Sequence, residues 1–176
     1  HQDVLYMASN RFHRSLDRGD HFETLSDDLT RGTIKGNVPY GTLTSVHESP
    51  LRFGRLAVGS DDGLIHMSPD GGYTWENRTP PAPAAAPNRM LWVTEVLWSH
   101  HAPDRVYAAL NGYRHDHFAP YLYASDDNGR SWTRLGDDGT VRSGLPMEPI
   151  NALTESEDID GLLFCGTDGG LYASLD

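Results

Sequence analysis

One eight-residue pattern recurs along the chain and constrains its fold more than any other feature. The pattern S-x-D-x-G-x-[ST]-W occurs at residues 68–75 and 125–132. A looser copy at residues 15–22 ends in a phenylalanine, and a fourth copy begins at residues 174–176. The first serines of successive copies lie 53, 57 and 49 residues apart. A period of about 50 residues with one aromatic motif per unit is typical of β-propeller blades.

Each unit contains short β-rich runs that are separated by turn residues. No segment has a sustained apolar period of 3.6 residues, so we expect little helix. The sequence predicts an all-β fold of about 14 strands, grouped as three, four, four and three. These groups form β-propeller blades of four-stranded antiparallel sheets, two complete and two partial. The runs cover residues 4–8, 43–47, 55–59, 64–67, 93–99, 106–110, 121–124, 150–154, 162–166 and 170–173.

We interpret residues 1–176 as a single partial propeller of about three to four blades. The blade boundaries are expected at residues 1–38 (partial), 39–88, 89–146 and 147–176 (partial). An open arc of blades exposes the apolar faces and strand edges of its first and last sheets. We therefore expect a fragment of a larger propeller, in which further blades or a partner chain cover these two sheets.

The repeated pattern is suited to stabilising a tight turn between the third and fourth strands of a blade. Its aspartate can accept hydrogen bonds from backbone N–H groups, and its glycine supplies a backbone conformation that is costly for other residues. Its hydroxyls close the turn, and its aromatic side chain packs as an apolar plug. We predict a structural role, not a catalytic one, for Ser15, Asp17, Gly19, Phe22, Ser68, Asp70, Gly72, Trp75, Ser125, Asp127, Gly129, Trp132, Ser174 and Asp176.

These repeats resemble the Asp-box, or BNR, signature of sialidase-like and sortilin (VPS10)-like β-propellers. The segments YGTLTSVHESP at residues 40–50, VGSDDG at 58–63 and GTDGGLYASLD at 166–176 are similar to secreted bacterial proteins of this type. Such proteins are often labelled glycosyl hydrolases. The resemblance implies a secreted, periplasmic or cell-surface location, although no signal peptide is visible in this chain. It is specific for architecture and much less so for function, because one fold hosts many functions.

The charge balance argues against two classes of partner. The chain carries 14 lysines and arginines against 25 aspartates and glutamates, for a formal net charge of −11. Nucleic acid and anionic membrane surfaces both need clustered cations. No apolar run approaches the length of a membrane span. No CxxC, HExxH, EF-hand, GxGxxG or P-loop pattern is present, so we expect no cofactor and no metal. The expected partner is a protein, a peptide or a glycan.

A glycoside hydrolase needs a pair of carboxylates that face one another across a cleft. Candidates near first strands are Glu48, Glu95 and Glu155, and Asp116 lies in a long loop. The sequence does not show which two of these acids face each other. A sialidase is disfavoured, because the arginines do not recur on first strands.

The loop before residue 121 is the best candidate for a binding surface, since long loops on a rigid scaffold commonly carry recognition. An ordered insertion that packs on the neighbouring blade is the alternative. The candidate binding residues of this loop and of the strand that follows it are Tyr113, His115, Asp116, His117, Phe118 and Tyr121. His115 and His117, like the pair His100-His101, have a spacing that metals favour, but turn and loop positions favour a structural role.

Three further features have structural interpretations. Cys165, the one cysteine, lies in an apolar run and is expected in the core. Residues 80–87 are proline-rich and predict an extended surface loop. Trp92 and Trp98 are six residues apart, so strand alternation predicts one shared face.

These observations favour a non-catalytic, exported propeller scaffold that binds a protein, a peptide or a glycan, with assembly into a larger complex as a further expectation. The alternative is a xyloglucanase-like glycoside hydrolase that has part of its site outside this chain.

Overall fold

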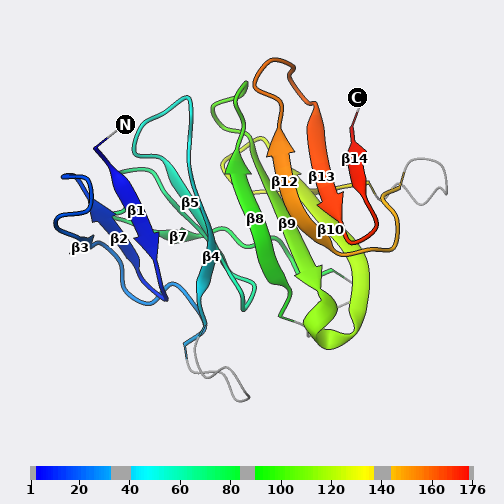
Figure 1. The fold of residues 1–176 in the computed structure, drawn as a ribbon, viewed down its shortest axis with the longest axis horizontal. Helices are drawn as coiled ribbons and strands as arrows, with labels where there is room; N and C mark the ends of the chain where they lie inside the picture. Colours follow the sequence, from blue (N-terminus) through cyan, green and yellow to red (C-terminus); the bar gives the residue numbers. More distant parts are fainter. Residues whose placement is uncertain (1–2, 33–40, 84–89, 137–143, 175–176) are drawn as a thin grey trace.

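The computed structural model describes residues 3–32, 41–83, 90–136 and 144–174, and in these ranges the chain is almost entirely β. Four antiparallel sheets stand side by side in chain order (Figure 1). The one helical element described is a single 3-10 turn, η1 (Tyr113–His115). The predicted all-β class and the grouping of strands as three, four, four and three are confirmed.

Each sheet follows the chain from strand to neighbouring strand, as in a meander. The first sheet contains β1 (Leu5–Ala8), β2 (Phe12–Ser15) and β3 (Glu23–Thr24). The second contains β4 (Leu43–Glu48), β5 (Leu56–Ser60), β6 (Ile65–Ser68) and β7 (Glu76–Asn77). The third contains β8 (Trp92–Trp98), β9 (Val106–Gly112), β10 (His117–Ser125) and β11 (Thr133–Leu135). The fourth contains β12 (Ile150–Glu155), β13 (Leu163–Thr167) and β14 (Leu171–Ala173).

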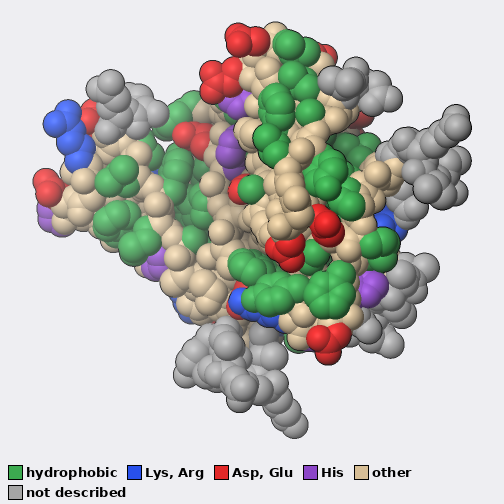
Figure 2. All heavy atoms as spheres, turned by 45° about the vertical axis from the view of Figure 1, so that its right-hand side comes forward, with side chains coloured by type: hydrophobic (Ala, Val, Ile, Leu, Met, Phe, Trp, Pro, Cys, Tyr) green, Lys and Arg blue, Asp and Glu red, His purple; other side chains and the backbone are tan. Residues whose placement is uncertain are grey.

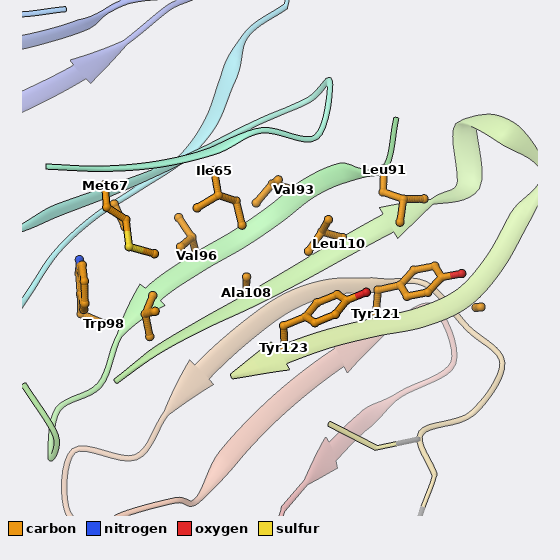
Figure 3. Close-up of a cluster of buried hydrophobic side chains, with 13 residues drawn as sticks. Ile65, Met67, Leu91, Val93, Val96, Trp98, Ala108, Leu110, Tyr121 and Tyr123 are labelled. Atoms are coloured by element: carbon orange, nitrogen blue, oxygen red, sulfur yellow. The ribbon is translucent and has the colours of Figure 1, made fainter. Parts of the chain in front are cut away.

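The hydrophobic core is divided into three clusters, and each cluster fills one junction between neighbouring sheets. The largest joins the second and third sheets, where Ile65 and Met67 face Val93 and Trp98 (Figure 3). A second cluster joins the third and fourth sheets, and a third joins the first and second sheets around Phe12. Face-to-face packing of successive sheets is the arrangement that propeller blades require.

The first strands of neighbouring sheets are also joined by hydrogen bonds at the same register. The Thr44 hydroxyl on β4 donates to the Val93 carbonyl on β8 at 2.7 Å. One sheet further along, the Thr94 hydroxyl on β8 donates to the Ile150 carbonyl on β12 at 3.0 Å. The two junctions therefore repeat one geometry, as expected from a repeated sequence.

The repeated pattern forms the turn between the last two strands of the first, second and third sheets, with the same geometry in these three copies. In the second copy the Ser68 hydroxyl donates to Asp70 Oδ1 at 2.9 Å and accepts the Gly72 N–H at 2.9 Å. Asp70 also accepts the backbone N–H of Thr74 at 2.9 Å and the Thr74 hydroxyl at 2.7 Å. The third copy has the same bonds between Ser125, Asp127, Gly129 and Ser131.

The first copy reaches this geometry with a different side chain. Its Asp17 accepts the Ser15 hydroxyl at 2.7 Å and the His21 backbone N–H at 2.9 Å. The His21 ring nitrogen Nδ1 then takes the place of the hydroxyl, 2.7 Å from Asp17 Oδ2. Of the fourth copy, Ser174 lies just after β14, and Asp176 lies outside the described residues.

The aromatic residue that ends each pattern packs toward the preceding sheet. The Trp75 ring lies edge-on to Phe12 of the first sheet, with ring centres 5.1 Å apart. The Trp132 indole N–H donates to the Arg78 carbonyl of the second sheet at 2.8 Å. Phe22, the corresponding residue of the first copy, is 41% exposed.

A β-bulge in β8 corrects one expectation about the tryptophans. The pairing of β8 with β9 shifts register between Val93 and Glu95. Val93, Val96 and Trp98 consequently share the core face, and Trp98 is buried there. Trp92 is thereby placed on the opposite face, so the prediction of one shared face was wrong. An extra residue in one strand reverses the alternation beyond it, and sequence spacing alone does not reveal it.

Cys165 lies in the core between the third and fourth sheets, as its apolar run predicts. Burial raises the pKa of its thiol to about 11. Of the proline-rich stretch, residues 80–83 are described without regular secondary structure, and residues 84–87 lie outside the described residues.

Candidate binding site between the third and fourth sheets

A pocket of about 350 Å³ opens where β8 and β12 begin. The third sheet contributes Trp92 from β8, Asn111 from β9 and Tyr113 from η1. The fourth sheet contributes Asp168 from the turn between β13 and β14, and its β12 contributes Asn151. Pro149 completes the lining. The pocket therefore joins two successive sheets at the end of the molecule where the turns between second and third strands lie.

Two aromatic side chains form one wall of this pocket. The ring centres of Trp92 and Tyr113 are 6.0 Å apart, and the Tyr113 side chain is 45% exposed. The Arg114 guanidinium covers the Trp92 ring at 4.7 Å and donates to Asp61 of the second sheet at 3.3 Å. Arg114 thus anchors the loop to the neighbouring sheet. This contact agrees with the alternative of an ordered insertion, and it also holds Tyr113 in place.

Within the part of the chain that the structure describes, the Trp92 indole nitrogen has no hydrogen-bond partner, although it is buried from solvent. A buried N–H group without an acceptor costs free energy, because it has lost its hydrogen bond to water and has formed no hydrogen bond within the protein. A ligand oxygen in this pocket would satisfy that donor.

The polar wall of the pocket is a chain of hydrogen-bonded side chains. The Asn111 amide N–H donates to Asn151 Oδ1 at 3.0 Å, and the Asn151 amide N–H donates to Asp168 Oδ1 at 2.7 Å. Asn111 Oδ1 in turn accepts the Tyr113 backbone N–H at 2.8 Å. This chain fixes the orientation of both amides. The Asp168 carboxylate is exposed, and in the described ranges only its Oδ1 accepts a side-chain hydrogen bond, so Oδ2 is open to a ligand donor.

The six loop residues predicted from the sequence are not gathered in one place. Tyr113 lines the pocket. Asp116 ends η1 with a left-handed backbone, at φ 53°. His117 Nε2 lies 2.5 Å from the Tyr121 hydroxyl, and Tyr121 is fully buried in the core. Phe118 is 50% exposed on β10, and His115 is exposed on η1.

The three glutamates considered for glycoside hydrolysis have structural partners. Glu48, the last residue of β4, accepts the Tyr6 hydroxyl at 2.9 Å and the Gly54 N–H at 2.7 Å. Glu155, the last residue of β12, is 3% exposed and accepts the Ser99 hydroxyl at 3.0 Å. Glu95 accepts the Ser45 hydroxyl at 2.7 Å. Neither these glutamates nor Asp116 line the pocket, where Asp168 is the one acid among the described lining residues.

The histidines considered as metal ligands also contact the protein itself. The His100 backbone N–H donates to Glu155 at 2.6 Å, and the His101 ring lies 2.8 Å from the Ser156 carbonyl oxygen. Within the described ranges, no group of three or more His, Cys, Asp or Glu residues is arranged to hold a metal ion.

Sequence reasoning missed most of the polar residues of this pocket. Asn111 and Asn151 belong to no motif, and Asp168 was interpreted only as part of the segment at residues 166–176 that carries the family resemblance. Trp92 was expected to share a strand face with Trp98. The available signal was positional: Asn111 lies next to the end of a second strand and Asn151 next to the start of a first strand, and such positions meet at the same edge of neighbouring sheets.

Carboxylates are dispersed over the face shown in Figure 2, interspersed with hydrophobic side chains. In the part of the chain that the structure describes, no helix is both long enough and apolar enough to cross a membrane.

Comparisons with known proteins show the fold. No protein-family model matches the chain, and no curated protein matches it. Among solved structures, YCF48 bound to D1 peptide is 12% identical with a TM-score of 0.57, over 94% of this chain and 43% of that one. A GH74 enzyme from Niastella koreensis is 12% identical with a TM-score of 0.62, over 94% of this chain and 23% of that one. An extracellular domain of the putative hybrid two-component system BT4673 from B. thetaiotaomicron is 17% identical with a TM-score of 0.64, over 100% of this chain and 20% of that one.

This chain spans less than half the length of each of these proteins. At such low identities the likeness carries the fold and not the activity. Together with the four successive sheets, it shows a propeller-like β fold. The matched proteins include both a protein bound to a peptide and a GH74 enzyme.

Proposed function

We propose that this chain is part of a non-catalytic, exported β-propeller of the Asp-box class that binds a glycan or an extended peptide between its third and fourth sheets. Three copies of one serine–aspartate turn geometry support the Asp-box assignment. The resemblance to sortilin-like and secreted bacterial propellers supports a secreted, periplasmic or cell-surface location. A peptide-bound propeller among the similar structures is compatible with a binding role.

The aromatic and polar walls of the pocket carry this proposal. An aromatic ring offers a flat surface to the apolar face of a sugar or to a peptide side chain. The buried Trp92 indole N–H offers a donor that lacks an acceptor. The oriented amides of Asn111 and Asn151, with the Asp168 carboxylate, add polar groups at fixed positions. This combination suits a polar ligand rich in hydroxyl or amide groups.

The test begins with glycan and peptide arrays, and hits are then measured by isothermal titration calorimetry. Tyr113→Ala and Asn151→Ala are each expected to weaken binding about tenfold, because each removes one wall of the pocket. Tyr73→Ala is the matched control, since Tyr73 is an exposed tyrosine outside the pocket. Binding that Tyr113→Ala and Asn151→Ala leave unchanged would contradict the proposed site. The class of array hits decides between glycan and peptide.

Glycoside hydrolysis is the second candidate function, and the likeness to a GH74 enzyme is the observation that favours it. The described pocket lining holds one carboxylate, Asp168, whereas the reaction generally uses two. The assay is release of reducing sugar from xyloglucan by the wild type and by Asp168→Asn. Turnover that Asp168→Asn abolishes would replace the binding function with a hydrolytic one.

A further inference from the structure

A second, smaller pocket lies at the opposite end of the strands, between the second and third sheets. It has a volume of about 140 Å³, which is below the usual range for a drug-sized ligand. β8 ends here, at Trp98, and the turn of the third pattern copy closes one side. Its size suits one small group, in contrast to the first pocket.

The Trp98 side chain supplies a buried donor to this pocket. Trp98 is 1% exposed, and its indole nitrogen has no hydrogen-bond partner among the described residues. Its place beside Met67 at one end of the core cluster is visible in Figure 3. The corresponding last residues of β4 and β12 are Glu48 and Glu155, whose carboxylates accept hydrogen bonds at their own junctions. The junction of the second and third sheets has a donor at the position where the other two have an acceptor.

Three arginines surround the same space, in a chain whose net charge is −11. The Arg55 guanidinium stacks on the Trp98 ring at 4.5 Å and is held by Asp104 at 2.9 Å. Arg78 pairs with Glu76, the one acid among the described residues that line this pocket. Arg130 makes one hydrogen bond, to the Asp127 carbonyl at 3.4 Å, and no ion pair among the described residues. The lining therefore has an excess of positive charge.

We propose that this pocket binds a tetrahedral oxyanion, a sulfate or phosphate group, through Arg78, Arg130 and the Trp98 indole N–H. Guanidinium groups bind such oxyanions by strong, charge-assisted hydrogen bonds, and the indole is a donor only. The anion satisfies the orphaned indole N–H and neutralises Arg130. Free inorganic ions and sulfate or phosphate esters on a larger ligand present the same chemistry.

The experiment follows the four tryptophan indole N–H signals by two-dimensional ¹H–¹⁵N NMR during titration with sodium sulfate. Sodium chloride at matched ionic strength is the reference. The expected result is a saturable shift of the Trp98 signal, which Trp98→Phe identifies. Arg130→Gln and Arg78→Gln are expected to raise the Kd for sulfate about tenfold. Arg18→Gln changes an exposed arginine outside the pocket and is expected to leave the Kd for sulfate unchanged.

Further titrations distinguish the source of the anion. Tighter binding of inorganic phosphate than of phenyl phosphate assigns the pocket to the free ion, and the reverse order assigns it to an ester. Calorimetry with sulfate measures the same Kd without the need to assign tryptophan signals. An equal response to chloride, or a Kd for sulfate that Arg130→Gln and Arg78→Gln both leave unchanged, would overturn the proposal. Neither outcome bears on the first pocket.

Discussion

The Tyr107 hydroxyl donates a hydrogen bond to the Glu155 carboxylate at 3.1 Å, across the junction of the third and fourth sheets. Burial, followed by the charge of Glu155, raises the pKa of Tyr107 to about 12. The Tyr6 hydroxyl makes the corresponding bond to Glu48 between the first and second sheets. Both tyrosines are the second residue of their strand, and both glutamates are the last residue of theirs. A Tyr–Glu pair therefore joins two of the three described junctions.

Glu155→Ala is expected to lower the free energy of unfolding by about 3 kcal/mol, because it leaves several buried donors without an acceptor. Glu155 accepts the Ser99 hydroxyl at 3.0 Å and the His100 backbone N–H at 2.6 Å, besides the Tyr107 hydroxyl. Urea unfolding monitored by circular dichroism measures the change. Glu157→Ala, at an exposed glutamate two residues away, is the control. Equal stabilities of the two variants would show that the junction does not depend on this carboxylate.

Gly72→Ala tests how closely the repeated turn packs on the preceding sheet. Gly72 has a φ of +100°, and a Cβ there would lie 2.8 Å from the buried ring of Phe12. Backbone strain and overpacking together are expected to cost about 3 kcal/mol of unfolding free energy.

Gly161→Ala separates these two costs. Gly161 has a φ of +76°, and a Cβ there meets nothing within 4 Å. Backbone strain alone is expected to cost about 1 kcal/mol. If chemical denaturation gives the same loss for both variants, the contact with Phe12 contributes nothing to stability.

The sequence was sufficient to predict the sheets, because each pattern copy marks one turn and the turn residues between copies mark the strand ends. Asp70 and Asp127 have the hydrogen-bond partners that their spacing indicates. The contacts between sheets were not predictable in the same way. Tyr107 and Glu155 are 48 residues apart, and no local pattern relates a strand's second residue to the last residue of a later strand.

The candidate site was predictable only in part, for a local reason and a long-range one. Of the six binding residues predicted in the long loop, Tyr113 lines the pocket. The bulge after Val93 turned Trp92 away from the core and into the pocket, and strand alternation could not anticipate it. Asn151 and Asp168 come from the next sheet, so their position depends on how two sheets pack.

Asp70→Ala is expected to lower the Tm by about 4 °C, because the turn loses the acceptor for the Thr74 backbone and hydroxyl groups. Ligand binding at the pocket between the third and fourth sheets should not change, since Asp70 does not line it. Differential scanning calorimetry and titration of an array hit measure the two properties. Lost affinity in a stably folded Asp70→Ala protein would assign the repeated aspartates a functional role.

Acid is expected to destabilise the fold through the aspartates of the repeated turns. The Ser131 hydroxyl, the Ser131 backbone N–H and the Ser125 hydroxyl lower the pKa of Asp127 from 3.8 to about 2, and the pKa of Asp17 and of Asp70 is also lowered. Because the folded-state pKa lies below the unfolded-state value, this stabilisation is fully present above about pH 4. It is lost as the pH falls through about 2.

Asp127→Asn isolates the proton-linked part of this effect. The variant should be less stable than the wild type at neutral pH, because a neutral amide is a weaker acceptor for Ser131 than a carboxylate. The difference in urea midpoint should shrink as the pH falls from about 4 to about 2, where Asp127 of the wild type also becomes neutral. Asp158→Asn changes an exposed aspartate whose side chain has no ion pair among the described residues. The difference in urea midpoint between this variant and the wild type should stay constant across the same pH range. A difference between the wild type and Asp127→Asn that stays constant with pH would mean that the Asp127 charge does not stabilise the turn.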